Sequence, residues 1–283
     1  MSFKTPIVRT VDDLRAVVHQ WRQEGLKVAL VPTMGALHKG HLSLVDFARN
    51  HADRVVVSIF VNPKQFGPNE DLDKYPRQEE ADINALSSIK TDLAFCPTVD
   101  EMYPKGFTTN ITLTSMTTVL CGANRPGHFD GVATVVTKLL LQCLPDVAVF
   151  GEKDYQQLQV IKRFVSDLDI PVSILGAPLI RDGDGLATSS RNVYLTEEER
   201  SIAQYIPKIL QDMAKKAHQG QNLESLMEDG AIDLIEAGFD SVDYLEFREA
   251  STLLTSQTVT NETRLFVAAK IGKTRLIDNI PVA

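Results

Sequence analysis

The chain has 283 residues, of which 43% are hydrophobic and 23% charged, and this indicates a globular protein of one or two domains. The net charge of −8 argues against nonspecific binding of nucleic acid or of an anionic membrane, because both require a basic surface. The three cysteines are widely spaced and form no Cys-x-x-Cys pair, so neither a disulfide framework nor a zinc site is expected. The start lacks a signal-peptide core and no apolar run is long enough to span a bilayer, which predicts a cytoplasmic protein.

The first strong pattern is a strand, a turn and a helix. Val28–Val31 is an unbroken apolar run, typical of a strand buried in a parallel sheet, and Gly35 allows the turn that follows. Helical spacing begins after His38, so His38 and His41 share one face of the first turn. A helix N-terminus offers unpaired N–H groups and partial positive charge, so the pattern predicts a phosphate site. A helix start with two solvated histidines would give the same pattern.

A second buried strand, Arg54–Val61, leads directly into a polar, proline-rich loop at 61–77. Loops of this length in a compact protein are commonly disordered or serve as binding lids. Its place after a buried strand favours a lid, because open α/β sheets bind ligands at the carboxyl ends of their strands. Beyond it we expect a helix at 79–89, a short strand at 93–95 and an edge strand at Ile111–Leu113.

A second strand–turn–helix follows in the middle of the chain. Arg125 and His128 lie in a glycine-rich turn before an apolar helix. The buried strand Val147–Phe150 then leads into Gly-Glu-Lys-Asp, which places Lys153 just ahead of a helix at 155–165. This arrangement predicts a second contribution to the same edge of the sheet, although a lysine after a strand is also common as a solvated surface charge.

The pattern changes after Arg181. Asp182–Gly185 is strong turn chemistry, and we expect there a hinge and a boundary between domains 1–184 and 185–283. Ser189, Ser190 and Arg191 follow, offering hydroxyls and a guanidinium that suit phosphate oxygens, although a serine-rich hinge would look similar.

The last hundred residues predict a small α+β domain. Two helices are expected first, at 196–218 and 223–237, and three strands after them, at 242–247, 265–269 and 274–280. The preceding part alternates strands and helices, which predicts an α/β domain with a parallel sheet.

Five separated segments together resemble the pantothenate synthetase family, whose members join pantoate to β-alanine with ATP; they are PTMGALHKGH, FVNPKQFGPNEDLDKYPR, RPGHFDGVATVV, VFGEKDYQQL and GLATSSRN. The resemblance implies a Rossmann-like N-terminal domain that binds ATP and pantoate, a smaller α+β C-terminal lid domain, and a homodimer. It also implies that the pantoate carboxylate attacks the α-phosphorus of ATP and that β-alanine then displaces AMP from the pantoyl adenylate.

The resemblance also implies roles for individual residues. The ATP phosphates would meet His38, His41 and Lys153, with Ser189, Ser190 and Arg191 closing over the leaving group. The nucleotide site would be lined by Met34, Gly151 and Asp154, and pantoate would be held by Gln65 and Gln157. Asp82 matches a family position near Mg²⁺.

Two positions depart from the family pattern, and two rival functions compete. Lys64 and Thr188 stand where methionine, or leucine at the second position, is usual, and neither change removes a group that the chemistry needs. Another adenylyl-transferring enzyme of the nucleotidylyltransferase superfamily would share the His-x-Gly-His motif; ligation to transfer RNA is disfavoured by the acidic charge. A catalytically silent nucleotide-binding protein would not need His38, His41, Lys153 and Arg191 together.

Overall fold

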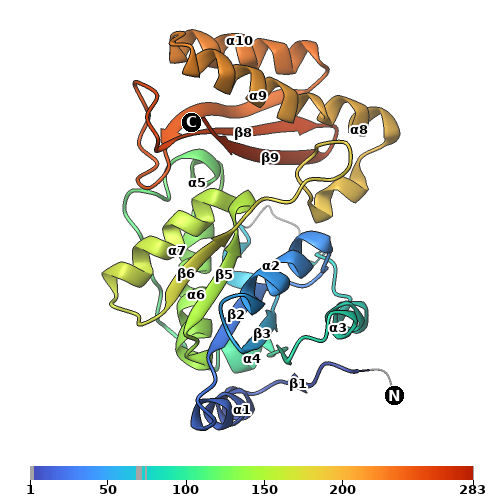
Figure 1. Cartoon of the computed structure of the whole chain (residues 1–283), viewed down its shortest axis with the longest axis vertical. Helices are drawn as coiled ribbons and strands as arrows, with labels where there is room; N and C mark the ends of the chain where they lie inside the picture. The colour runs from blue at the N-terminus through green and yellow to red at the C-terminus, as the bar shows by residue number, and fades with distance from the viewer. Residues whose placement is uncertain (1–2, 68–71, 74, 283) are drawn as a thin grey trace. The chain divides into compact units, whose positions relative to one another are not determined.

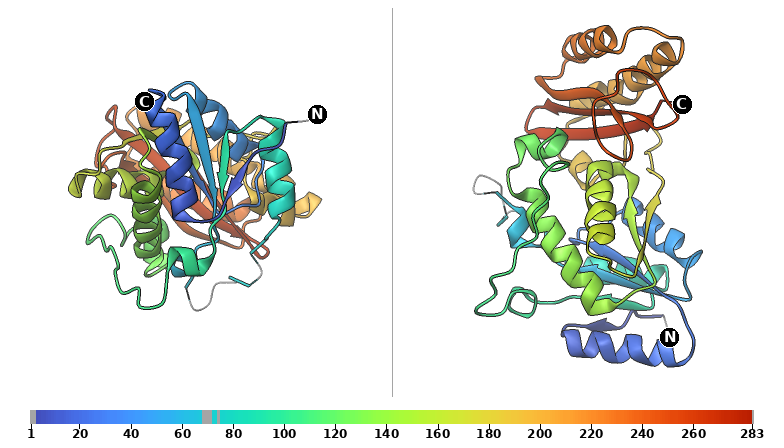
Figure 2. Two further views of the ribbon diagram at one scale, coloured as in Figure 1. Left: turned by 90° about the horizontal axis from the view of Figure 1, so that it is seen from below. Right: turned by 90° about the vertical axis from the view of Figure 1, so that its left-hand side faces the viewer.

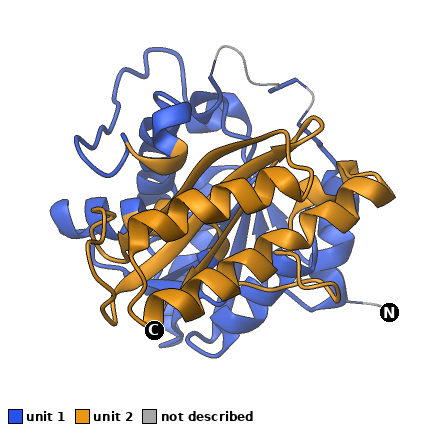
Figure 3. Ribbon diagram, turned by 90° about the horizontal axis from the view of Figure 1, so that it is seen from above, with its two compact units in different colours: residues 1–118, 122–152, 160–178 blue, residues 119–121, 153–159, 179–283 orange. Residues whose placement is uncertain are grey.

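The computed structural model describes residues 3–67, 72–73 and 75–282, and the chain forms two compact units (Figure 3). Unit 1 comprises Met1–Thr118, Gly122–Glu152 and Val160–Pro178, and unit 2 comprises Val119–Cys121, Lys153–Gln159 and Leu179–Ala283. The chain therefore passes back and forth between the units instead of completing one before the other. No helix among the described residues is long and apolar enough to cross a membrane.

Unit 1 is built on a parallel sheet in the order β1-β4-β3-β2-β5-β6 (Figure 1). Its strands are β1 Ile7–Val8, β2 Val28–Thr33, β3 Arg54–Ile59, β4 Leu93–Phe95, β5 Val147–Gly151 and β6 Ser173–Ala177. The central strands are buried on both faces, which is why they are continuous apolar runs in the sequence. The predicted Rossmann-like parallel sheet is confirmed.

Helices cover both faces of this sheet (Figure 2). Alternate residues of β2 separate the two layers: Ala29 and Val31 pack in one core with Val45 of α2 and Leu86 of α3. On the other face α6 packs against β2 and α1. The helices are α1 Val11–Gln23, α2 Lys39–Arg49, α3 Glu79–Ser88, α4 Val99–Met102, α5 Leu120–Asn124, α6 His128–Cys143 and α7 Tyr155–Asp167, of which α5 and α7 have residues in both units.

Two details of unit 1 differ from expectation. The strand expected at Ile111–Leu113 is absent; the backbone N–H of Ile111 instead donates to the Thr134 hydroxyl on α6, at 3.0 Å. Strand β2 continues past Pro32, because β2 pairs with β5 only at Ala29 and Leu30, so the missing proline N–H falls beyond that pairing. Of the expected lid loop, residues 68–71 and 74 lie outside the described residues.

Unit 2 has an antiparallel sheet, β7-β8-β9, covered by helices α9 and α10 (Figures 1 and 3). Its elements are the 3-10 helix η3 Ser190–Tyr194, α8 Glu197–Ala203, α9 Tyr205–His218, α10 Leu223–Glu236, β7 Ser241–Glu249, β8 Thr263–Ile271 and β9 Thr274–Pro281. The α+β prediction is confirmed. The helix expected over 196–218 is broken at Gln204, because Pro207 has no N–H to donate to the carbonyl of Ala203 and its ring would clash with that carbonyl.

Candidate active site

Two histidines cap the N-terminus of α2. His38 is the N-cap residue, and its Nδ1 accepts the N–H of Gly40 at 3.1 Å. His41 reaches back, and its Nδ1 accepts the N–H of His38 at 3.3 Å. The two rings contact each other with centroids 4.1 Å apart and planes tilted by 39°. Because each Nδ1 acts as an acceptor, a neutral ring carries its proton on Nε2, the edge that points away from the helix backbone.

The capping box uses several backbone amides around the start of α2. The N–H of Gly35 donates to the Thr33 hydroxyl at 3.2 Å, and those of His38 and Gly40 donate to the imidazoles. In the first turn of α2, the amides of Gly40 and His41 thus have acceptors within the chain, since His41 N–H donates to the His38 carbonyl at 2.8 Å. The motif also presents imidazole edges at the start of α2, and the phosphate site expected here stays a prediction.

Asp82 completes the same turn from α3. Its Oδ2 accepts the N–H of Ala36 at 3.0 Å and its Oδ1 accepts the N–H of Leu37 at 2.8 Å. The side chain is 1% exposed. Ala36 has a φ of +50° and Gly35 a φ of +80°, so the turn lies in the left-handed region that ordinary side chains disfavour. One buried carboxylate thus holds two successive amides of a strained turn.

Gln65 lies at the end of the short 3-10 helix η1, Pro63–Gln65, and is 7% exposed. Its Nε2 contacts Met34 Sδ at 2.7 Å, and its Oε1 accepts from Asn62 Nδ2 at 3.1 Å. The Tyr103 hydroxyl donates to Asn62 Oδ1 at 2.7 Å, and burial raises the pKa of this phenol well above its usual range. The amide of Gln65 is therefore held in one orientation by neighbours that are themselves fixed.

Gly131 lets helix α6 come close to this amide. A Cβ at Gly131 would meet the Lys64 carbonyl oxygen at 2.3 Å, so no other residue fits there without a shift of the backbone. Nδ1 of His128, at the start of α6, donates to the Gln65 carbonyl at 2.8 Å. The Lys64 ammonium lies over the Phe107 ring, 5.1 Å from its centroid, so the substitution at Lys64 has a local partner.

Gly151 ends strand β5, the parallel neighbour of β2. Gly151 and Met34 therefore follow the carboxyl ends of adjacent parallel strands, the edge at which open α/β sheets bind ligands. In unit 1, the structure thus gathers Met34, His38, His41, Gln65 and Gly151 around that edge, with Asp82 behind the turn.

In unit 2, a small pocket joins three of the predicted residues, Lys153, Ser189 and Arg191. Lys153 lies in the 3-10 helix η2, Glu152–Asp154, and its side chain is 19% exposed, which argues against a solvated surface lysine. Its Nζ is 3.7 Å from Asp154 Oδ2, and its carbonyl accepts from Asn279 Nδ2 at 3.0 Å. The Ser189 hydroxyl caps η3 by accepting the N–H of Arg191 at 3.2 Å.

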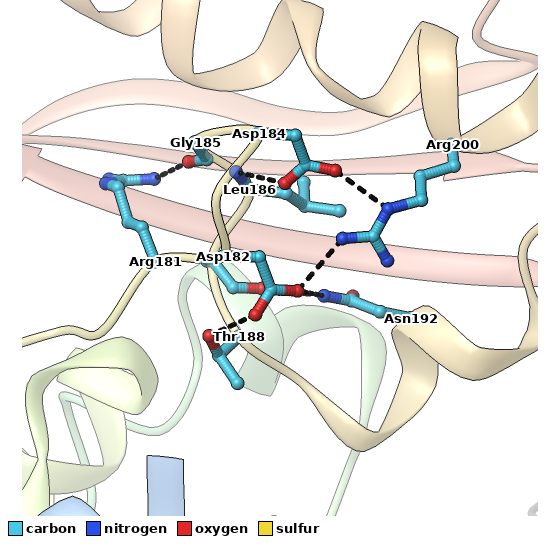
Figure 4. Close-up of polar contacts among 9 residues, drawn as sticks. Arg181, Asp182, Asp184, Gly185, Leu186, Thr188, Asn192 and Arg200 are labelled. Atoms are coloured by element: carbon cyan, nitrogen blue, oxygen red, sulfur yellow. Dashed lines mark hydrogen bonds and ion pairs between the residues drawn. The ribbon is translucent and has the colours of Figure 1, made fainter. Parts of the chain in front are cut away.

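The turn at Asp182–Gly185, which precedes the Ser189 and Arg191 side of this pocket, is held by side-chain hydrogen bonds (Figure 4). Arg200 donates to Asp184 Oδ2 at 2.7 Å and to Asp182 Oδ2 at 3.1 Å. The Thr188 hydroxyl donates to Asp182 Oδ1 at 2.8 Å, so threonine at this position has a specific partner. All these residues belong to unit 2. Bending at Asp182–Gly185 would break these bonds, so this geometry does not favour the expected hinge there.

Several residues of the site were missed from the sequence. Asn62 and Tyr103 hold the Gln65 side chain, and Arg275 of β9 lines the pocket with Lys153 and Arg191. His128 was noted in its glycine-rich turn, but its contact with Gln65 was not expected. Asn62 before a proline is a recognisable cap, but nothing distinguishes Arg275 from any other strand arginine. Within the described chain, Ser190, Asp154 and Gln157 do not line that pocket.

A parallel sheet with a His-x-Gly-His helix start at its carboxyl edge, and a cationic pocket containing a lysine and an arginine, defines a Rossmann-like protein that acts on nucleotide phosphates. The sequence matches the pantoate–β-alanine ligase family over residues 6–281. The chain belongs to this family.

Individual relatives agree over their whole length. The pantothenate synthetase of Paramagnetospirillum magneticum is 58% identical, with 100% of this chain and 99% of the relative covered. The crystal structure of pantothenate synthetase from Thermus thermophilus superposes with a TM-score of 0.92 at 45% identity, covering 98% of this chain and 99% of that one. A pantoate–β-alanine ligase from Francisella tularensis, solved in complex with β-γ ATP and β-alanine, superposes with a TM-score of 0.81 at 37% identity, with 98% of each chain covered.

Proposed function

We propose that the residues gathered in the two units divide the ligation of pantoate to β-alanine between them. The reaction itself follows from the family: the pantoate carboxylate attacks the α-phosphorus of ATP and releases pyrophosphate, and the β-alanine amine then attacks the acyl carbon of the adenylate and releases AMP. The observation that carries the proposal is the pair of histidine caps, because it fixes two imidazole rings through Nδ1 at the helix start that follows the carboxyl end of β2.

The histidines and the cations share the phosphate charge in this proposal. Adenylation builds negative charge on phosphate oxygens in the transition state, and positioned donors accelerate such a step. His38 and His41 offer N–H donors from rings fixed by the backbone, while Lys153, Ser189, Ser190 and Arg191 offer charge and hydroxyls to the leaving pyrophosphate. Met34, Gly151 and Asp154 line the nucleotide, with Asp154 on the ribose. The substrate carboxylate is already a nucleophile, so no activated serine or cysteine is required.

Pantoate is assigned to Gln65 and Gln157. Pantoate carries two hydroxyls beside its reacting carboxylate, and a neutral amide both donates to and accepts from a hydroxyl. A lysine or arginine at either position would pair with the carboxylate and reduce its nucleophilicity. Support comes from Gln65, whose amide is buried and oriented by Asn62.

We propose that Mg²⁺ enters the site bound to ATP and is not held by protein side chains. A role for Asp82 as a metal ligand does not fit its surroundings, because the carboxylate is 1% exposed and each oxygen accepts a backbone N–H. Within the described chain, no group of three or more His, Cys, Asp or Glu side chains is placed to hold a metal. Mg²⁺ neutralises phosphate charge, and phosphate oxygens and water suffice to hold it. A homodimer whose C-terminal domain acts as a lid is proposed from the resemblance. The cytoplasmic location and the division into domains 1–184 and 185–283 are proposed from the sequence pattern.

Pyrophosphate exchange tests the order of the two steps. We expect labelled pyrophosphate to enter ATP when pantoate is present and β-alanine is absent, because the adenylate forms without the amine. Exchange that appears only after β-alanine is added would refute a free-standing adenylate. No exchange and no AMP formation under any condition would favour a silent nucleotide-binding protein.

A further inference from the structure

We propose that Asp82 is a positioning residue for the histidine pair, acting through the turn at Gly35–Leu37, and that it is not a metal ligand. This inference rests on the proposed role of His38 and His41 in adenylation. The geometry behind it is independent of that role, because it concerns only contacts within unit 1.

The turn between β2 and α2 cannot hold its shape through ordinary backbone preferences. Ala36 is a residue with a Cβ at a φ of +50°, a conformation that is strained for a non-glycine residue and persists only where the surroundings impose it. The turn is too short to form backbone hydrogen bonds of its own for these amides. The acceptors for Ala36 and Leu37 instead come from α3, more than forty residues later in the chain.

The fit between the turn and the carboxylate is close. A Cβ at Gly35 would lie 2.9 Å from Asp82 Oδ2, so glycine allows the carboxylate to approach as well as allowing a φ of +80°. Asp82 enters from the first turn of α3, on the side of that helix that also buries Ile83 and Leu86. Its position is thus set by the packing of α3 against the sheet.

The turn fixes the positions of the two histidines that follow it. Leu37, the second amide held by Asp82, immediately precedes His38, whose backbone N–H must meet His41 Nδ1 at 3.3 Å. A rotation of the turn would move that N–H and release the His41 ring, and with it the direction of the Nε2 edge. Displacing reacting groups by about 1 Å can cost on the order of 10² in rate. Asp82 therefore acts on the chemistry through backbone geometry.

The test compares Asp82→Asn with Glu80→Gln, an exposed change on the same turn of α3. Asparagine keeps the size of the side chain but turns an NH₂ towards one of the two backbone N–H groups. We expect kcat for pantoate-dependent pyrophosphate exchange to fall by about tenfold to a hundredfold, with little change in the KM values for ATP and pantoate or in the concentration of Mg²⁺ that gives half-maximal rate. Glu80→Gln should behave as wild type.

Nitrogen-15 NMR of the imidazoles gives a readout that does not need activity. Wild type should show His38 and His41 as Nε2–H tautomers, and Asp82→Asn should shift these two signals while those of the other histidines stay in place. Unaltered signals together with unaltered kcat would overturn the proposal. Full recovery of the rate of Asp82→Asn at high Mg²⁺ would also overturn it, since that identifies a metal ligand. A lower Tm with unchanged kcat and unchanged NMR signals would overturn it as well, because it indicates a purely structural role.

Two further arms keep the result interpretable. If Asp82→Asn does not fold, Asp82→Glu retains both acceptors but displaces them by one methylene, and the same loss in kcat and the same shifts are expected; wild-type values in that variant would count against positioning. If wild type itself shows no exchange, the proposed function fails, while the NMR comparison still decides the role of Asp82.

Discussion

Two imidazole rings do at α2 what serine, threonine or aspartate does at most helix N-termini. His38 and His41 each give Nδ1 to a backbone amide, and this single bond fixes the ring plane and the tautomer together. A serine cap would satisfy the amide and present a neutral hydroxyl, whereas a histidine cap presents a ring nitrogen that can also carry positive charge. In each of these histidines, Nδ1 caps the helix, while Nε2 of the same ring is the atom that we propose contacts the ligand.

Lys153 is the cation for which we expect the largest single effect. Removing one positioned donor to transition-state charge costs about 10²–10³ in rate, and a full charge adds to this. We expect Lys153→Ala to lower kcat for adenylation by at least that factor while the circular dichroism spectrum and Tm stay close to wild type, because the pair of its side chain with Asp154 is long, at 3.7 Å.

Lys162→Ala is the matched control, since Lys162 is an exposed lysine on α7 and should tolerate the change. Wild-type turnover in a folded Lys153→Ala variant would return Lys153 to the status of a structural or surface charge.

The buried thiols predict a dependence of stability on alkaline pH. Burial raises the pKa of Cys96 and of Cys143 to about 12 from 9.0. A thiol whose folded pKa is raised favours the folded state fully below the unfolded pKa, and that contribution is lost as the pH rises through the folded value. We therefore expect the free energy of unfolding to fall between about pH 9 and pH 12.

Urea titrations at several pH values measure this effect, with Cys96→Ser and Cys143→Ala as comparisons in which part of the slope disappears. Rapid reaction of all three thiols with a disulfide reagent in the native state at pH 8 would contradict the burial argument.

At the scale of elements, the sequence predicts what depends on local pattern. The apolar runs at β2, β3 and β5 are buried in the sheet as expected, and the change to helices followed by three strands after Thr196 is found as expected, although the first of the two expected helices is divided into α8 and α9. What it could not predict depends on partners far along the chain. The anchoring of Ala36 by Asp82, like the use of Thr134 by Ile111, joins segments with no shared local signal.

One missed element had a signal. Pro207 is the third residue of α9 and forces the break at Gln204. A proline is tolerated in the first turn of a helix but not in its interior, so this residue indicates that a new helix begins shortly before it. Nothing in the sequence indicates that Arg275 lines the pocket. The pairing of β8 with β9 decides which face of the sheet its side chain takes.

The turn at Asp182–Gly185 is an element whose stability can be measured. Arg200 holds both aspartates, and these hydrogen bonds, first to Asp184 and then to Asp182, raise the pKa of its guanidinium. The arginine side chain is 36% exposed, so we expect Arg200→Ala to cost only about 1 kcal/mol in urea unfolding. Because the turn leads into Thr188 and Ser189, we also expect faster proteolysis near Gly185 and a lower rate of adenylation.

Arg163→Ala removes an exposed i,i+4 pair with Asp167 and serves as the control, for which about 0.3–0.5 kcal/mol and normal proteolysis are expected. Unchanged cleavage near Gly185 in Arg200→Ala would mean that the turn keeps its shape without the arginine.

At the scale of the whole molecule, the two units share one chain in an interleaved way. Unit 2 depends on Tyr155, which packs against Phe266 with ring centroids 5.8 Å apart, and on Gln156, whose amide accepts from the Cys121 N–H at 3.0 Å and donates to the Val119 carbonyl at 2.8 Å. Arg264 of β8 also stacks on the Tyr155 ring, at 4.0 Å. These partners come from the middle of the chain, far from the rest of unit 2.

This interleaving limits how the gene can be divided. A fragment beginning at Leu179 would contain the antiparallel sheet and its helices but would leave Phe266 and Arg264 without the ring they pack against. The complementary fragment would end in a sheet whose strand β5 leads into a lysine without its neighbours Ser189 and Arg191. Recombination between homologous genes that exchanges the last hundred codons therefore has to carry the codons for 119–121 and 153–159 with it, or match them, for the hybrid protein to keep both its core and its pocket.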